Sequence, residues 1–178
     1  SATLIGLRGH DLGTEHGYAV SIQWTGNRGE GTATYRSYGR DHRILAAGKA
    51  HEIEGSSDRT FRGDAERWNP EELVIAALSQ CHLLSYLHVA ASSGLVVVDY
   101  RDEASGTLEQ EGEGGRLIEA TLRPRVTLAA HHSDEDARRA AHLHERASEL
   151  CFIANSVSFP VGHEPITLIA GAQEAPRL

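Results

Sequence analysis

The chain has 178 residues, of which 40% are hydrophobic and 24% charged, a composition that excludes disordered, collagen-like and coiled-coil chains. A net charge of −8 without basic clusters excludes the cationic face that nucleic-acid-binding proteins present to phosphates. Uninterrupted apolar runs such as Leu95 to Val98 are too short to cross a membrane, and no secretory signal is visible. We therefore expect a cytoplasmic protein that binds neither nucleic acid nor membrane.

The first sixty residues are predicted to form strands joined by turns. Apolar residues alternate with smaller or polar ones over residues 18–24, which is the period of a β-strand. After a turn at 26–29, residues 32–36 alternate again and predict a second strand. A tight turn at 39–41 then leads to a third short strand at 44–46.

A polar, irregular loop predicted over residues 55–69 precedes a long helix. Asn69 is a favourable N-cap, Pro70 suits the first helical position, and Glu72 follows Asn69 by three residues, as in a capping box. The helix is expected to run to about Ser92. Its side chains are apolar around most of its circumference, so we expect a central helix that is buried on more than one side.

The rest of the chain predicts strands and one more helix. A buried strand is expected at 95–100, and alternating segments follow at 118–122 and 126–130. Glycines at 112–115 predict a hairpin, so these strands are expected to be antiparallel. A last strand is predicted at 166–170.

Ser133 is the expected N-cap of the second helix, with acidic residues in its first turn. One face of this helix carries Ala137, Ala140, His144, Ala147 and Cys151. The order of elements predicts an α+β fold, with two helices packed on an antiparallel sheet. We expect one domain over residues 1–178, strand-rich over about 15–60 and helix-containing over about 69–170.

Cys81 and Cys151 are the two cysteines of the chain, and no CxxC motif is present, so neither a zinc ribbon nor a thioredoxin-type site is predicted. Cys81 falls within the buried helix and Cys151 closes the apolar face of the second one. A helical cysteine in a core is more often a small hydrophobic residue than a nucleophile. The two thiols are therefore either core residues or a redox pair.

Eleven histidines are present, but none forms the HExxH pattern of a zinc site, and we expect solvated side chains without a metal or another cofactor. His88 lies on the same helix face as Cys81, about 10 Å away along the axis, and His82 points about 100° away from it. A Cys–His dyad within this helix is therefore not expected.

The segment Asn69-Pro70-Glu71-Glu72-Leu73, followed by Ala76-Ala77 and Cys81 with a distant Cys151, resembles the signature of the OsmC/Ohr family. The similarity extends upstream to Tyr38-Gly39-Arg40-Asp41-His42 and downstream to Cys151-Phe152-Ile153, so it covers roughly Trp24 to Ile169. His82 and Phe152, which follow the two cysteines, resemble an OsmC-like side branch more than the Ohr branch.

The resemblance implies an intertwined homodimer with active sites at the subunit interface. It implies a cysteine-based peroxidase that reduces organic hydroperoxides to alcohols, with Cys81 as the peroxidatic and Cys151 as the resolving cysteine. Arg40 and Glu71 match the family positions that assist the thiol. An external dithiol of the lipoyl type is the implied reductant, and no cofactor is implied.

Elementary chemistry agrees with these roles. A thiol attacks peroxide only as the thiolate, which burial disfavours and a nearby guanidinium favours, while a carboxylate orients that guanidinium. The resulting sulfenic acid condenses with a second thiol to form a disulfide. The competing expectation is a non-catalytic, stress-related binding or structural module of the same fold, in which both cysteines are inert.

The spacing of Glu71 and Cys81 predicts a dimer with composite sites. On one continuous helix the two residues stand about 15 Å apart along the axis and about 80° apart around it. They cannot share a site within one chain unless the Arg40 side chain bridges much of that gap. An antiparallel two-fold pair of these helices, centred near Ala76 and Ala77, would set Glu71 of one subunit opposite Cys81 of the other.

Overall fold

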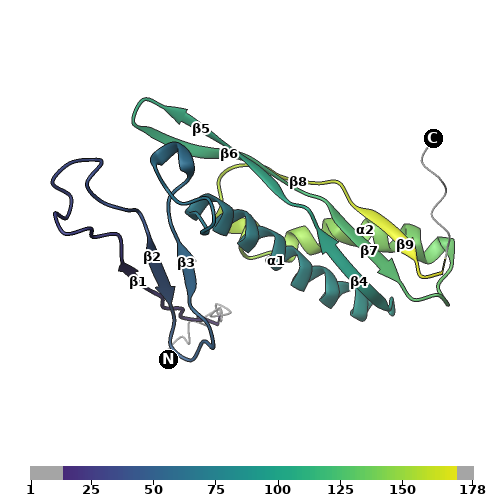
Figure 1. The fold of residues 1–178 in the computed structure, drawn as a ribbon. Helices are drawn as coiled ribbons and strands as arrows, with labels where there is room; N and C mark the ends of the chain where they lie inside the picture. Colours follow the sequence, from purple (N-terminus) through teal and green to yellow (C-terminus); the bar gives the residue numbers. More distant parts are fainter. Residues whose placement is uncertain (1–13, 172–178) are drawn as a thin grey trace, which may run out of the picture. The chain divides into compact units, whose positions relative to one another are not determined.

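The computed structural model describes residues 14–171 (Figure 1), and the chain divides between Arg67 and Trp68 into two compact units. The division falls inside the loop predicted for residues 55–69. Each unit has its own sheet structure and its own polar contacts, and each is described separately below.

The N-terminal unit contains a three-stranded antiparallel sheet of β1 (Ser21–Trp24), β2 (His42–Leu45) and β3 (Ile53–Gly55), in the order β1-β2-β3. A short 3-10 turn, η1 (Arg59–Phe61), follows. The strands expected near residues 18–24 and 44–46 are therefore confirmed.

The strand predicted at residues 32–36 is wrong, because this segment forms turns. The side-chain oxygen of Asn27 accepts hydrogen bonds from the amides of Gly29 and Gly31, at 2.9 and 3.1 Å. The Ser37 hydroxyl likewise accepts from the amide of Thr34 at 3.0 Å. Local side-chain bonds of this kind offer the backbone an alternative to a ladder.

The tight turn predicted at residues 39–41 is also wrong. The amide of Gly39 donates to the carbonyl of Gly26 at 2.8 Å, and the amide of Thr25 donates to the carbonyl of Asp41 at 2.9 Å. These bonds prolong the pairing of β1 with β2 beyond Trp24, so the chain stays extended here.

The second unit contains both helices and two three-stranded sheets, ordered β4-β7-β9 and β5-β6-β8. Its elements are α1 (Pro70–Ser92), β4 (Val97–Asp102), β5 (Ser105–Glu111), β6 (Gly114–Leu122), β7 (Pro124–Leu128), α2 (Asp134–Leu150), the 3-10 turn η2 (Ala154–Ser156), β8 (Val161–His163) and β9 (Ile166–Ile169). The predicted α+β class is confirmed, as is the hairpin, which joins β5 to β6.

The sheets are mixed, and not antiparallel throughout as predicted. β8 pairs with β6 in parallel, and β9 pairs with β7 in parallel. Parallel neighbours need a crossover connection, which α2 supplies after β7. The strand β8 has no counterpart among the predicted strands, because a segment of three residues shows no periodicity.

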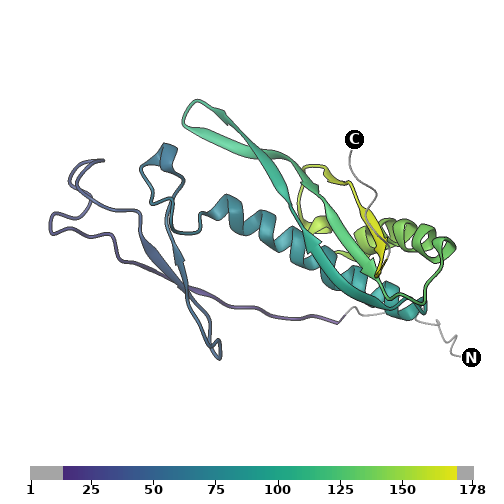
Figure 2. The ribbon, with the colours of Figure 1, turned by 45° about the vertical axis from the view of Figure 1, so that its right-hand side comes forward.

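Both helices pack on one face of the β4-β7-β9 sheet, where the side chains of Val126 and Leu128 meet them (Figures 1 and 2). The buried residues of this cluster are Tyr86, Val89, Ala90, Leu95, Val126, Leu128, Ala140 and Ala147. A second cluster places Leu78 of α1 against Ala120 and Leu122 of β6. Together these two clusters hold α1 against both sheets and against α2.

The helix α1 begins as predicted, with a reciprocal capping box between Asn69 and Glu72 and with Pro70 in the first turn. Its burial differs from the prediction, because Leu84 is 64% exposed and Leu87 is 38% exposed in the single chain. By length and composition alone, with a mean hydropathy of 1.5 over 18 residues, α1 is apolar enough to cross a membrane. Core helices of globular proteins meet the same criterion.

Candidate active site

Cys81 occupies the middle of α1, at the edge of the face that is buried in the second unit. Its neighbours Leu78 and His82 are fully buried, whereas Cys81 itself is partly accessible. The capping box and the first-turn carboxylates start the helix eleven residues earlier and so determine which side chains reach this edge. Cys81 is therefore held on a rigid element with one side open.

Cys151 is the C-cap of α2 and is 1% exposed. Its amide donates to the carbonyl of Ser148 at 3.2 Å, and its carbonyl accepts from the amide of Asn155 at 3.1 Å. Its sulfur accepts a hydrogen bond from the amide of Ala154 at 3.4 Å. The chain thus turns around Cys151 and keeps the sulfur pointed into the unit.

The two sulfurs meet across the interface between α1 and α2. Burial, and after it a hydrogen bond with the Cys81 side chain, raises the pKa of the Cys151 thiol to about 11. Both cysteines are free thiols. The fold therefore brings together two reduced cysteines that lie seventy residues apart in the sequence.

Glu71 lies in the first turn of α1, as expected. Its carboxylate has no hydrogen bond or ion pair with any residue between 14 and 171.

Arg40 belongs to the N-terminal unit, and its contacts lie there. The guanidinium donates to the carbonyls of Tyr38 and Tyr35, at 2.7 and 2.9 Å, and it stacks on both tyrosine rings, at 4.1 and 4.3 Å from their centroids.

Stacking on two rings and two hydrogen bonds hold the Arg40 guanidinium in one plane, and cation–π contacts of this kind favour arginine over lysine. Within the second unit, the structure brings Cys81 and Cys151 together but joins neither of them to Glu71, and Arg40 belongs to the other unit. The roles expected for those two residues therefore stay predictions.

The expectation of solvated histidines is wrong for a cluster on the buried side of α1. His82 is 0% exposed and His144 is 3% exposed, and Nε2 of His82 lies 2.9 Å from Nδ1 of His144. The ring of His163 lies 4.4 Å from that of His82, and the ring of Tyr86 lies 4.1 Å from that of His144. The apolar face of α2, which includes His144, was the sequence signal for this burial.

Burial, and after it the neighbouring His163, lowers the pKa of both paired histidines, to about 3 for His82 and to about 4 for His144. The pair is therefore neutral at physiological pH, with one proton between the two facing nitrogens. Over residues 14–171, no cluster of three or more His, Cys, Asp or Glu side chains is arranged to hold a metal ion.

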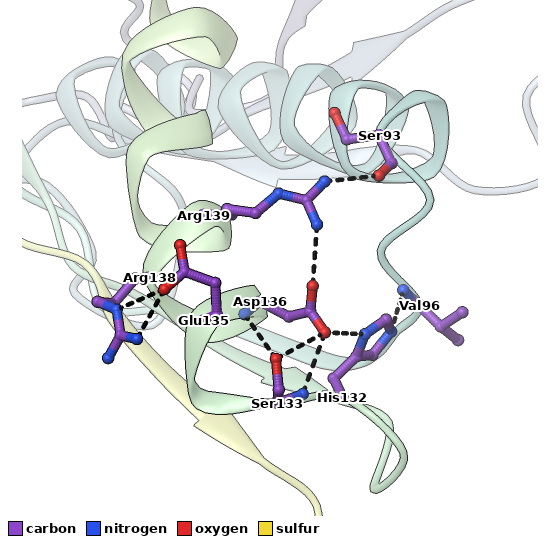
Figure 3. A network of polar contacts seen from close by, with 8 residues as sticks. All are labelled: Ser93, Val96, His132, Ser133, Glu135, Asp136, Arg138 and Arg139. Atoms are coloured by element: carbon purple, nitrogen blue, oxygen red, sulfur yellow. Dashed lines mark hydrogen bonds and ion pairs between the residues drawn. The ribbon is translucent and has the colours of Figure 1, made fainter.

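A polar network ties the start of α2 to the end of α1 (Figure 3). The amide of Val96 donates to Nε2 of His132 at 2.9 Å, so the proton of this imidazole sits on Nδ1, which faces Asp136 at 3.2 Å. Arg139 bridges Asp136 and the carbonyl of Ser93, at 2.9 and 3.1 Å. These bonds fix the separation of the two helices at the end remote from the thiols.

Comparison with known proteins agrees with this fold. The model of the family described as OsmC-like protein matches residues 63–164, which is more than half of the chain and includes both cysteines. The chain belongs to the OsmC-like family. The OsmC/Ohr resemblance seen in the sequence is thereby confirmed.

An OsmC-like protein of unknown function from Vibrio cholerae is 29% identical, with a TM-score of 0.76 over 85% of this chain and 100% of that one. The uncharacterized protein YmaD of Bacillus subtilis is 23% identical over 143 residues, which are 80% of this chain and 87% of YmaD. The organic hydroperoxide resistance protein OsmC of Legionella pneumophila shares the fold, with 16% identity and a TM-score of 0.63 over 88% and 99% of the two chains.

Proposed function

We propose that this chain is a cysteine-based peroxidase that reduces organic hydroperoxides to alcohols, with Cys81 as nucleophile and Cys151 as resolving cysteine. The observation that carries the proposal is the contact between two free thiols, one partly accessible and one buried. The names of two structural relatives, organic hydroperoxide resistance proteins of Legionella pneumophila and Elizabethkingia anophelis, support the choice of substrate.

The reaction has three steps. The Cys81 thiolate attacks one peroxide oxygen, the O–O bond breaks, and the alkoxide leaves as the alcohol after taking up a proton, so that Cys81 carries a sulfenic acid. The Cys151 sulfur then attacks the Cys81 sulfur, the S–O bond breaks and water leaves, which forms the Cys81–Cys151 disulfide. An external dithiol, of the lipoyl type, reduces that disulfide and is itself oxidised to a disulfide.

Arg40 and Glu71 are proposed to assist the thiolate, as the family resemblance implies. A guanidinium stabilises a thiolate because it is always charged, and a carboxylate orients the guanidinium. The clamp of Tyr35 and Tyr38 on Arg40 supports this role, since it holds the planar group in one orientation. In the reducing cytoplasm that we propose as its location, both cysteines would return to thiols after each turnover.

A homodimer is proposed because the apolar side of α1 stays uncovered in one chain. Leu84 and Leu87 are exposed, and at about 100° per residue they lie on the same side of the helix as Ala76 and Ala77. Exposed apolar surface of this kind marks interaction sites. Pairing of two α1 helices through this side would cover it and would bring the partner's Glu71 toward Cys81.

One observation favours a non-catalytic module instead, namely the burial of Cys151 and its raised pKa, which are usual for inert core cysteines. Titration of thiols before and after one equivalent of cumene hydroperoxide separates the two functions. The peroxidase loses both thiols and releases one equivalent of alcohol, whereas the inert module keeps both. The Cys81→Ser variant, nearly equal in volume, is the matched control and should consume no peroxide. Native-rate turnover by this variant refutes Cys81 as the nucleophile.

A further inference from the structure

The interface between α1 and α2 carries polar contacts at three successive levels. Cys81 meets Cys151 at the first level, and His82 meets His144 at the second. At the third level the hydroxyl of Tyr86 donates to the carbonyl of Ala140 at 3.1 Å. From the first level to the third, the residue numbers rise along α1 and fall along α2, so the two helices run antiparallel. The imidazole pair lies next to the thiol pair in this order.

Among residues 14–171, the contact between the two imidazoles is the single hydrogen bond of each of these side chains. Nδ1 of His82 and Nε2 of His144 are buried without a hydrogen-bond partner among residues 14–171. An unsatisfied buried polar group costs about 1–3 kcal/mol, so a shift of α2 along α1 would add two more unpaired nitrogens to the core. The facing nitrogens therefore oppose sliding of the two helices.

The rings are nearly parallel, with planes inclined by 13° and centroids 5.2 Å apart, and the facing nitrogens are 2.9 Å apart. One ring must donate and the other must accept, so at least one of the two imidazoles must be neutral. The groups that face the pair are the His163 ring from β8, the Tyr86 ring, and Tyr100 beside it from β4. None of these carries a positive charge near neutral pH, so the N–H···N bond is kept.

We propose that His82 and His144 are positioning residues, whose mutual hydrogen bond holds α1 and α2 in the register that places the Cys151 sulfur against the Cys81 sulfur. This inference rests on the disulfide step of the proposed function, but it concerns the approach of one sulfur to the other and not the reaction with peroxide. Removal of the bond is expected to slow disulfide formation and to leave the first reaction of Cys81 unchanged.

The test uses 4,4′-dithiodipyridine in place of peroxide, with the full chain at pH 7. The Cys81 thiolate attacks one sulfur of the probe and releases the first 4-thiopyridone. Cys151 then attacks the Cys81 sulfur of the mixed disulfide and releases the second, which forms the Cys81–Cys151 bond. Stopped-flow absorbance resolves the two releases as two phases.

In His82→Leu the second phase should slow at least tenfold while the first phase keeps its native rate. His88→Leu, a change at an exposed histidine of the same helix, is the matched control and should leave both phases unchanged. The double variant His82→Gln/His144→Asn places two amides where the facing nitrogens stood, and it should restore the second phase to within threefold of the native rate. A general packing defect would not be repaired in this way.

The inference is overturned if His82→Leu forms the disulfide at the native rate, or if the double amide variant is as slow as the single one. If a variant fails to fold, a measurement on the native protein still tests whether the hydrogen bond between the two imidazoles exists. A ¹⁵N–¹⁵N coupling across the hydrogen bond between the two imidazoles must be observed at pH 7, and its absence overturns the inference. A native chain that releases two thiopyridones but consumes no peroxide would refute the peroxidase and leave this inference standing.

Discussion

The sulfur of Cys151, at the C-terminal end of α2, lies in hydrogen-bonding contact with the sulfur of Cys81 in the middle of α1. Because both residues are held by helices, the Cys151 sulfur would already be in place when Cys81 reacts in the proposed cycle. The contact therefore bears on the step that follows the oxidation of Cys81, which is the formation of the disulfide.

In Cys151→Ser the first, stoichiometric reduction of peroxide should persist, but sustained turnover should be lost. Without a thiol beside it, the sulfenic acid on Cys81 proceeds to the sulfinic acid, which is irreversible in most proteins. Intact mass after excess peroxide should show two added oxygens on Cys81. In the native chain the same treatment should remove two hydrogens, and peptide mapping without reductant should link Cys81 to Cys151 alone.

Arg40→Lys should slow the reaction with peroxide by about tenfold or more, although the charge is kept. Lysine loses the planar group that stacks on Tyr35 and Tyr38, and loss of a charged hydrogen bond costs about 1.5–3 kcal/mol. The measurement is the pH dependence of Cys81 alkylation, with the exposed Arg36→Lys as control. An Arg40→Ala variant whose thiol pKa equals the native value would remove Arg40 from the site.

Leu84→Glu should convert the proposed dimer into monomers without unfolding the chain. Leu84 is 64% exposed in the single chain, so a charge there is tolerated in the monomer but is buried and unpaired in an interface. Sedimentation velocity at micromolar concentration measures the change. His142→Glu, on the exposed side of α2, should leave the association intact. A native chain that sediments as an active monomer would contradict the dimer.

The stability of the second unit should fall as the pH falls below about 6.5. The folded-state pKa values of His82 and His144 are lowered to about 3 and about 4, whereas in the unfolded chain they are near 6.5. Between those pKa values the unfolded chain binds more protons than the folded chain. Each unit by which the pH falls in this range therefore lowers the free energy of unfolding by about 1.4 kcal/mol for each histidine.

Urea unfolding at pH 7.5, 6 and 5 checks this loss. The double variant His82→Gln/His144→Asn, which lacks both titrating rings, should show a much flatter pH dependence. Equal free energies of unfolding for the native chain at pH 7.5 and pH 5 would show that the two histidines are not kept neutral by folding.

Ser133→Ala should destabilise the second unit by about 1 kcal/mol, the usual cost of an N-cap. The Ser133 hydroxyl accepts from the amide of Asp136 at 3.2 Å and also contacts its carboxylate. Denaturant melts are the measurement, with the exposed Ser158→Ala as control. If both variants unfold at the same urea concentration, the cap does not contribute.

The helices were predictable from the sequence because their signals are local. Asn69 with Glu72, and Ser133 with Asp136, form the reciprocal caps that mark each start. The α+β class followed from the order of elements, and the hairpin from its glycines. The parallel pairing of β8 and β9 was not predictable, since strand order depends on contacts between distant segments.

The candidate site was predictable in part. The two cysteines and their positions on α1 and α2 could be identified, but their contact needed the fold. The imidazole pair was missed because His82 stands among polar and apolar neighbours alike, and its partner lies sixty-two residues away. His144 stood on a predicted apolar face, and that placement was the available clue to its burial.

The position of Cys151 has a consequence for the order of events. The last carbonyls of α2 present the negative end of the helix macrodipole, and no basic side chain lies in the last turn. Reactive thiolates are usually found at the opposite, positive end of a helix. In the proposed reaction Cys151 is thus expected to keep its proton and to react second, so that the direction in which α2 runs would set the sequence of the two oxidations.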